Sequence, residues 1–269
     1  MENTLYPLQF MPVDTERPWG KEKWLLADLG FIDSEVLSGW LSGNTISELM
    51  QTYLEKMVGD DTFEYYGLQF PVSVKLIDFE GATPVFVHPD DTVAEERYDA
   101  LGRTALWKVL SAEPGACIRL GFRQKVTAGE LYAAAQEGRL ETLLNEIPVK
   151  AGDTFVLEPG VPYAFSGKAR ILEVSEASSL IFDLTDPEDL VEAFDFISLE
   201  GKEIPGQADT PHFKVKESPG LEDGEGEFLL HVTPDGAQLT LFPAEADKKT
   251  FPKEGLFIRP GRLSPTEDQ

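Results

Sequence analysis

Short apolar segments divided by turn residues constrain the fold of this chain more than any other feature of its sequence. Segments such as TPVFVH, ACIRLGF, DTFVLEP and ARILEVSE are rich in β-branched and aromatic residues, and Gly, Pro or Asp separates them. Short strands at close spacing with such punctuation are typical of an all-β sandwich or barrel. The 269 residues suffice for one elongated domain or for two packed subdomains. We therefore expect a mainly β fold.

A helical insert interrupts the β pattern near residues 127–146. It opens with Thr127 and Glu130, which form the T-x-x-E pattern of a capping box, and it continues with helix-forming residues. Gly138 is expected to divide the insert into two short helices. A further short helix is predicted for residues 186–194, DPEDLVEAF.

A second series of β segments begins beyond about residue 195. It comprises HFKVKE, EFLLHVT, AQLTLFPA and GLFIRPG, with spacers rich in turn residues. We expect two domains: a larger β domain over residues 1–195 that carries the helical insert, and a smaller C-terminal β unit over residues 196–269.

The strong negative charge of the chain excludes several classes of partner. There are 48 acidic and 23 basic residues, for a net charge of −25. Binding to nucleic acids or anionic membranes depends on neutralising phosphates with Lys and Arg, so we expect neither partner. An anionic substrate is also disfavoured, unless a local basic pocket overrides the overall field.

The expected location of the protein and the state of its cysteine follow from its lack of a long apolar stretch and from its single cysteine. No apolar stretch approaches the ~20 residues needed to span a bilayer, and the N-terminal MENTLYPLQF lacks the pattern of a signal peptide. We expect a cytoplasmic location. Cys117 is the single cysteine, which excludes an intrachain disulfide and a thiolate metal cluster. It is expected to be a small buried apolar residue.

Several motifs occur in the order found in a known enzyme family. These are ERPWG, FPVSVKLID, VHPDD, the block from GRTALW to PGA, EGRLETLLNEIPVKAGD and PGVPYAF. In this respect the chain resembles the type I phosphomannose isomerases, also called mannose-6-phosphate isomerases, from about residue 7 to residue 190. The resemblance implies a cupin fold: a double-stranded β-helix barrel with a helical insertion and a second, smaller cupin-like β unit at the C-terminus.

The resemblance also implies a reaction. The family interconverts mannose 6-phosphate and fructose 6-phosphate, with a zinc ion at the mouth of the first barrel. The metal orients the sugar oxygens and stabilises the negative charge that develops on them. Such a site needs about three or more N or O ligands and an open position.

The family's ligand positions are mostly replaced in this sequence. On the matching motifs, the four positions hold Phe86, His88, Ala105 and Tyr163, so His88 is the one family ligand that is kept. A family arginine falls at Asp183. Zinc is therefore expected to be absent from the family site, and only His88 would serve as a ligand there.

Two readings remain open for the other pocket residues. Lys75 and Arg103 keep positive charge and are either a clamp for an anion such as a phosphate or partners in salt bridges. Phe86 and Tyr163 either stack on a ligand or fill the barrel, and filling is favoured. His88 alone is more often a hydrogen-bonded pocket residue than a ligand. Asp90 and Asp91 are expected to form a turn after His88 and Pro89.

Three functions follow from these features. The first is a degenerate isomerase that binds a sugar or sugar phosphate through Lys75, His88, Arg103 and Tyr163. The alternative is an active mannose-6-phosphate isomerase with a rearranged metal site, in which His88 acts with nearby glutamates. The glutamates near the relevant strands are Glu113, Glu158, Glu173 and Glu176. A second alternative is a non-catalytic scaffold or regulatory protein.

Overall fold

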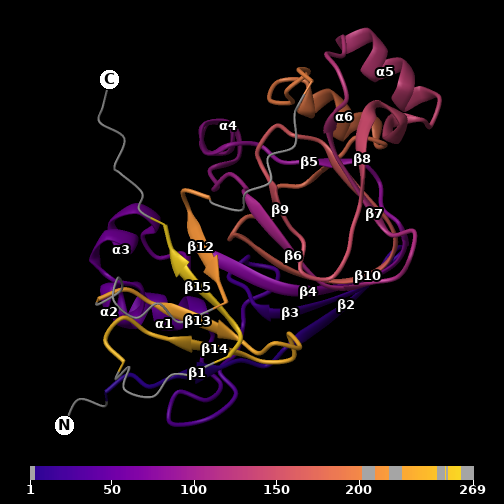
Figure 1. Ribbon diagram of the computed structural model, residues 1–269. Helices are drawn as coiled ribbons and strands as arrows, with labels where there is room; N and C mark the ends of the chain where they lie inside the picture. Colours follow the sequence, from indigo (N-terminus) through magenta and orange to yellow (C-terminus); the bar gives the residue numbers. More distant parts are fainter. Residues whose placement is uncertain (1–3, 202–209, 218–225, 247–251, 253, 262–269) are drawn as a thin grey trace. The chain divides into compact units, whose positions relative to one another are not determined.

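The computed structural model describes residues 4–201, 210–217, 226–246, 252 and 254–261 (Figure 1). The chain divides into two compact units. We call one the barrel unit, which comprises Thr15–Glu22 and Leu76–Ala208. We call the other the terminal unit, which comprises Met1–Asp14, Lys23–Lys75 and Asp209–Gln269.

This grouping differs from the domain boundary expected at residue 195. Strand β1 (Leu8–Gln9) pairs antiparallel with β14 (Leu239–Phe242), with Leu8 opposite Leu241. The N-terminal segment therefore belongs with the C-terminal strands. The sequence pattern gave no sign of this pairing, because it joins segments at opposite ends of the chain.

A ten-stranded sheet forms the main β structure. Six of its strands follow the order β11-β5-β10-β4-β3-β2. Of the other four, β6 and β7 pair with β10, β9 pairs with β6, and β8 pairs with β7. Strands β2 (Val13–Arg17), β3 (Gly20–Leu26) and β4 (Val72–Ala82) contribute residues to both units. The other strands lie in the barrel unit: β5 (Phe86–Val87), β6 (Ala105–Ala112), β7 (Cys117–Phe122), β8 (Leu144–Pro148), β9 (Thr154–Leu157), β10 (Tyr163–Glu176) and β11 (Phe182–Asp183).

Strand β10 brings the start and the end of its own sequence to the same end of the barrel. Its first half pairs with β7, with Tyr163 opposite Leu120, and its second half pairs with β6, with Ser175 opposite Ala105. The strand turns around Gly167, which has a positive φ of 105°. A Cβ there would lie 2.6 Å from the Cα of Ala116, so this turn requires glycine.

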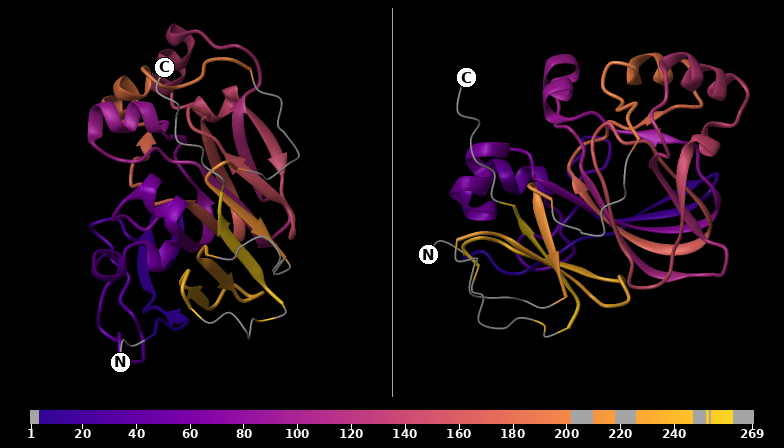
Figure 2. Two further views of the ribbon diagram at one scale, coloured as in Figure 1. Left: turned by 90° about the vertical axis from the view of Figure 1, so that its left-hand side faces the viewer. Right: turned by 45° about the horizontal axis from the view of Figure 1, so that its top comes forward.

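Four short helical elements belong to the barrel unit. They are α4 (Asp91–Tyr98), α5 (Ala128–Gln136), η1 (Leu140–Leu143) and α6 (Pro187–Ala193). The capping box at Thr127 and Glu130 is present, and Gly138, with φ 62°, separates α5 from η1 as predicted. Figures 1 and 2 show α5 and α6 together at one end of the barrel strands.

Aromatic side chains fill the interior of the barrel. Phe79 and Phe165 stack with their ring centroids 4.3 Å apart, and Trp107 packs against both. Such rings bury large apolar areas and prefer offset or edge contacts, which stabilise a closed barrel of this size. Cys117 is buried and unbridged, as expected.

The terminal unit contains a five-stranded sheet in the order β1-β14-β13-β15-β12. Its remaining strands are β12 (Phe213–Lys216), β13 (Leu229–Val232) and β15 (Leu256–Pro260). All four C-terminal strands lie within the predicted segments. The helices of this unit are α1 (Ile46–Tyr53), α2 (Glu55–Val58) and α3 (Asp60–Tyr66). Phe70 and Phe228 join distant parts of its core, with ring centroids 5.1 Å apart.

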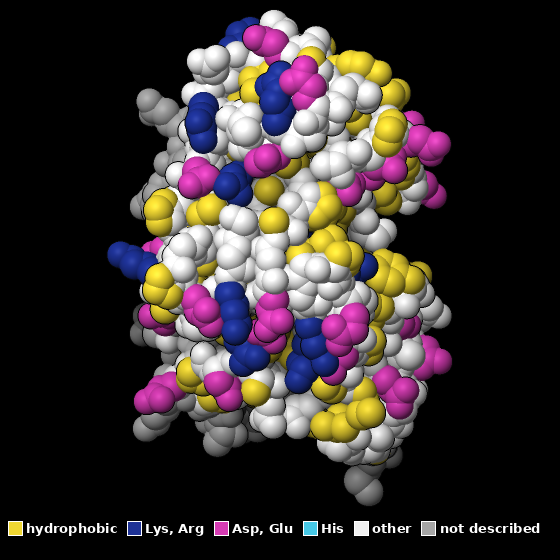
Figure 3. Space-filling model, turned by 90° about the vertical axis from the view of Figure 1, so that its right-hand side faces the viewer, with side chains coloured by type: hydrophobic (Ala, Val, Ile, Leu, Met, Phe, Trp, Pro, Cys, Tyr) yellow, Lys and Arg dark blue, Asp and Glu magenta, His cyan; other side chains and the backbone are white. Residues whose placement is uncertain are grey.

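Charged side chains of opposite sign lie close together on one face of the molecule (Figure 3). On the face in Figure 3, Lys and Arg side chains of the described residues alternate with Asp and Glu. Arg170, for example, makes a two-pronged contact with Asp78 at 2.6 and 2.9 Å. Within the described part of the chain, none of the helices combines the length and the apolar character that a membrane span requires.

Candidate functional site

The structure brings the four family ligand positions together at one end of the barrel. Phe86 lies on β5, directly opposite Tyr163 at the start of β10. His88 follows β5, and its Nε2 atom lies 2.6 Å from the hydroxyl of Tyr163. Ala105 begins β6 and belongs to the same buried apolar cluster as Tyr163. The sequence motifs therefore identified one spatial cluster.

The cluster is aromatic rather than metal-binding in character. The rings of Phe86 and Tyr163 lie 5.9 Å apart, and Trp107 meets Tyr163 edge-on at 5.6 Å. Trp19 packs edge-on against Phe86 at 5.6 Å. In this structure Phe86 and Tyr163 thus pack against other aromatic side chains of the barrel.

His88 and Tyr163 are both buried, and the phenol of Tyr163 is uncharged. Burial raises the pKa of the Tyr163 phenol well above its ordinary value, and the negative charge of Glu173 raises it further. The phenol therefore stays protonated at neutral pH. It can donate a hydrogen bond to Nε2 of His88, or accept one from it.

Arg103 is held inside the protein by partners of its own. Its side chain is only 1% exposed and contacts Glu173 at 2.5 Å and the carbonyl of Ser178 at 2.6 Å. The other oxygen of Glu173 accepts a hydrogen bond of 2.6 Å from Nε1 of Trp107. Arg103 was predicted to be either part of an anion clamp or a salt-bridge partner. In this structure it forms a salt bridge with Glu173.

The predicted clamp partner of Arg103 lies in the other unit. Lys75 is a residue of the terminal unit and is buried there. Its Nζ stands 4.6 Å from the ring centroid of Trp24, a cation–π contact. Each of the two predicted cations therefore has local partners of its own.

The candidate glutamates differ in their surroundings. Glu113 is an exposed partner of Lys168, at 3.2 Å. Glu173 and Glu176 are buried, and Glu176 accepts a hydrogen bond of 2.7 Å from the backbone N–H of Thr104.

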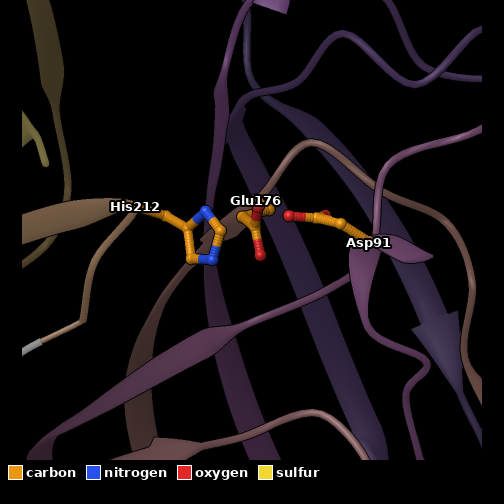
Figure 4. A group of neighbouring side chains, drawn as sticks. All are labelled: Asp91, Glu176 and His212. Carbon is orange, nitrogen blue, oxygen red and sulfur yellow. The ribbon is translucent and has the colours of Figure 1, made fainter. Parts of the chain in front are cut away.

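Asp91 is a residue that the sequence reasoning passed over as part of a turn. Its carboxylate and that of Glu176 approach within 4.8 Å of one another (Figure 4). Asp91 also accepts a hydrogen bond of 2.9 Å from the N–H of Gly102. A Cβ at Gly102 would lie 2.4 Å from the backbone nitrogen of Asp91, so this approach needs glycine. His212, the third residue in Figure 4, belongs to the terminal unit, where its Nδ1 lies 3.3 Å from the Tyr66 hydroxyl.

The residues at the family ligand positions do not fit a zinc ion. They supply one imidazole, whose Nε2 already contacts Tyr163, and a phenol that stays protonated. A catalytic zinc needs three such ligands and an open position. Asp91 and Glu176 form a separate pair of oxygen donors of the kind that hard cations prefer. The replacements at the family positions therefore do not by themselves show that metal binding has been lost.

Asp183 stands where the resemblance places an arginine of the family. Asp183 lies on β11, and its carboxylate accepts hydrogen bonds from the backbone and hydroxyl of Thr185 at 2.8 and 2.6 Å. It caps a turn before α6, and it offers no positive charge for a phosphate.

Comparisons with known proteins agree with this fold. No family model matches the chain. It is 37% identical over 117 residues, 44% of its length, to the mannose-6-phosphate isomerase of Streptococcus mutans. It is 29% identical over 202 residues, 68% of its length, to the mannose-6-phosphate isomerase ManA of Bacillus subtilis. These matches span 37% and 62% of the two relatives, less than two thirds of either.

The solved structures extend the similarity to nearly the whole chain. The crystal structure of the mannose 6-phosphate isomerase from Bacillus subtilis superimposes with a TM-score of 0.72. The match covers 96% of this chain and 98% of that one, at 20% sequence identity. The expected fold, mainly β with a large sheet and a smaller C-terminal sheet, is confirmed. The chain is therefore similar in sequence to mannose-6-phosphate isomerases over part of its length, and it shares their fold over nearly all of it.

Proposed function

We propose that the chain catalyses aldose–ketose exchange on a hexose 6-phosphate, with mannose 6-phosphate and fructose 6-phosphate as the substrate pair. The observation that carries this proposal is the sequence similarity to ManA over 68% of the chain. The reaction moves a proton between adjacent carbons. It needs a base that titrates near neutral pH and a donor for the oxygen on which charge develops.

His88 and Tyr163 are the residues that we assign to these tasks. Histidine is the side chain whose ordinary pKa lies nearest to neutrality. The Tyr163 phenol, 2.6 Å away and kept protonated, is a hydrogen-bond donor for a developing oxyanion. Both side chains are buried, so the proposal requires that substrate binding opens this end of the barrel. No step is assigned to zinc, because the family positions do not fit it.

A second candidate is binding of a sugar phosphate without turnover. It is favoured by a specific observation: Phe86 and Ala105 occupy two family ligand positions, and neither side chain can hold a cation. In this reading His88 and Tyr163 contact the ligand.

One experiment separates the two candidates. The purified chain is given mannose 6-phosphate after treatment with a chelator, and again with added zinc or manganese, while fructose 6-phosphate formation is followed. Binding of the same sugar is measured in parallel by thermal shift. Turnover supports the isomerase. Binding without turnover supports the second candidate, and the absence of both contradicts each of them.

Tyr163→Phe tests the role of the phenol within the isomerase proposal. The variant keeps the ring that packs against Trp107 and removes the hydroxyl, so kcat should fall while folding persists. Tyr98→Phe is the matched control. It removes a phenol oxygen that contacts Glu192 at 3.0 Å outside the candidate site, and it should leave kcat unchanged.

A further inference from the structure

A polar hollow lies on one face of the five-stranded sheet in the terminal unit. Its volume is about 530 Å³, which lies within the ~300–1,000 Å³ range of small-molecule sites. Its lining includes Gln9, His231, Thr233, Gln238, Thr240 and Glu254. We call this feature the sheet-face hollow.

The strand register places these side chains in one array. Thr240 on β14 lies directly opposite both Gln9 on β1 and His231 on β13. Residues that lie directly opposite one another point to the same face of a sheet. Thr233 and Gln238 are two positions along from His231 and Thr240, so they share this face as well. The floor of the hollow is therefore a continuous polar surface across three strands.

His231 is the buried member of this array. It is only 5% exposed, and its ring packs on Phe257 with centroids 5.1 Å apart. Its Nε2 lies 2.9 Å from the carbonyl oxygen of Glu254. Because a carbonyl only accepts, Nε2 carries the proton, and Nδ1 of the neutral ring is then an acceptor.

That acceptor has no hydrogen-bond partner among the residues that the structure describes. Nδ1 is not one of the buried side-chain atoms that lack a partner, so it is open to the solvent in the hollow. A ligand hydroxyl in the hollow would supply the missing donor.

A glycine keeps His231 in this position. Gly255 has a φ of 133°, and a Cβ there would lie 2.5 Å from Nε2 of His231 and from the carbonyl oxygen of Val232. The backbone of the 254–255 segment can thus approach the imidazole only because residue 255 has no side chain.

The chemistry of the lining selects the class of ligand. Two amides, the hydroxyl of Thr240 and one imidazole offer both donors and acceptors, while the hydroxyl of Thr233 donates to Asp235 at 2.6 Å. None of the described residues that line the hollow is a cation, and Glu254 adds a negative charge. In a chain of net charge −25, an anionic ligand is disfavoured here. The lining suits a neutral molecule with several hydroxyl groups.

We propose that the sheet-face hollow binds a neutral, unphosphorylated sugar. This site lies in the terminal unit and uses none of the residues assigned to aldose–ketose exchange. It would make the chain a receptor for free sugar as well as a protein that acts on sugar phosphates. The proposal stands or falls independently of the isomerase activity.

The test follows the imidazole signals of His231 by NMR in the full chain, assigned by their loss in His231→Asn. The probe is methyl α-D-mannopyranoside, whose blocked anomeric carbon prevents ring opening and hence aldose–ketose exchange. We expect a saturable shift of the His231 signals at millimolar probe. Mannose 6-phosphate should leave these signals in place, and an equal shift with it would overturn the assignment to neutral sugars.

Two variants make the test specific. Thr240→Val removes a hydroxyl at nearly constant volume and should weaken binding about five- to tenfold, the effect of one lost hydrogen bond. Thr52→Val, which removes a hydroxyl on α1 bonded to the Glu48 carbonyl, should leave binding unchanged. If Thr240→Val disturbs the sheet, Gln238→Ala replaces an exposed side chain of the same array. No shift of His231 with the probe, or equal binding by these variants, would overturn the proposal.

Discussion

The Nε2 atom of His88 and the hydroxyl of Tyr163 lie 2.6 Å apart, although 75 residues separate them in the chain. The contact forms because β5 and the start of β10 are paired, with Phe86 opposite Tyr163. It joins two residues that the motif resemblance places at metal-ligand positions of the family. In this structure Nε2 of His88 is therefore half of a hydrogen-bonded pair.

The stability of the barrel should depend on this pair. Tyr163→Phe leaves His88 buried without its phenol partner, so we expect a loss of about 1–3 kcal/mol in the free energy of unfolding. Urea denaturation measures it. Tyr98→Phe, whose phenol oxygen lies at an exposed site, should have little effect. Equal stability of wild type and Tyr163→Phe would mean that the contact contributes nothing.

The same tyrosine predicts a response to alkaline pH. The pKa of its phenol is raised in the folded chain, while in the unfolded chain it titrates near 10.0. Above that pH the unfolded state loses the proton and the native state keeps it, so stability falls as pH rises. Tyr163→Phe should show a smaller fall than wild type between about pH 9 and pH 11. Parallel curves for the two proteins would contradict the buried, protonated phenol.

Arg103 and Glu173 should behave as a buried ion pair. Arg103→Met leaves the Glu173 carboxylate buried without its cation, and we expect a loss of about 3–5 kcal/mol. The double variant Arg103→Met/Glu173→Gln should recover part of that loss, because no unpaired charge then remains. The surface pair of Arg97 and Asp195 is the control, and its disruption by Arg97→Met should matter far less. Additive losses in the double variant would refute the coupling.

Asp28 in the terminal unit should be a source of instability at neutral pH. Burial raises its pKa, opposed by a hydrogen bond of 2.8 Å from the Phe70 N–H, and Asp33 raises it further. Between its unfolded and folded pKa values, and above both, ionisation favours the unfolded chain. Asp28→Asn keeps an acceptor for Phe70 and should raise Tm at pH 7. The gain should vanish as pH falls well below the ordinary aspartate pKa of 3.8, where both states are protonated. A gain that is constant with pH would show that another effect is responsible.

The local parts of this structure follow from the sequence, and the long-range ones do not. Thr127, Glu130 and Gly138 set the ends of two helical elements through contacts within a few residues. The strands follow from runs of β-branched and aromatic residues bounded by turns. The pairing of Leu8 with Leu241 has no local signal, so the sequence did not indicate that the two ends of the chain belong to one unit.

The candidate site shows the same limit. The motifs located His88 and Tyr163, but their hydrogen bond depends on the pairing of β5 with β10. Arg103 has the positive charge expected for a phosphate clamp. Its guanidinium, however, contacts the carboxylate of Glu173, which is 70 residues away in the sequence. From the sequence Asp91 is interpreted as a turn residue. Glu176, whose carboxylate lies close to it in space, is on a strand far away in the sequence.

The rate of fructose 6-phosphate formation from mannose 6-phosphate, compared between wild type and His88→Ala, tests the central claim most directly. The account predicts turnover by wild type and a loss of about 100-fold or more in the variant, the scale of one general base. Circular dichroism confirms that the variant is folded. Equal turnover by the two proteins would remove His88 from the reaction, and no turnover by wild type under any metal condition would contradict the isomerase assignment itself.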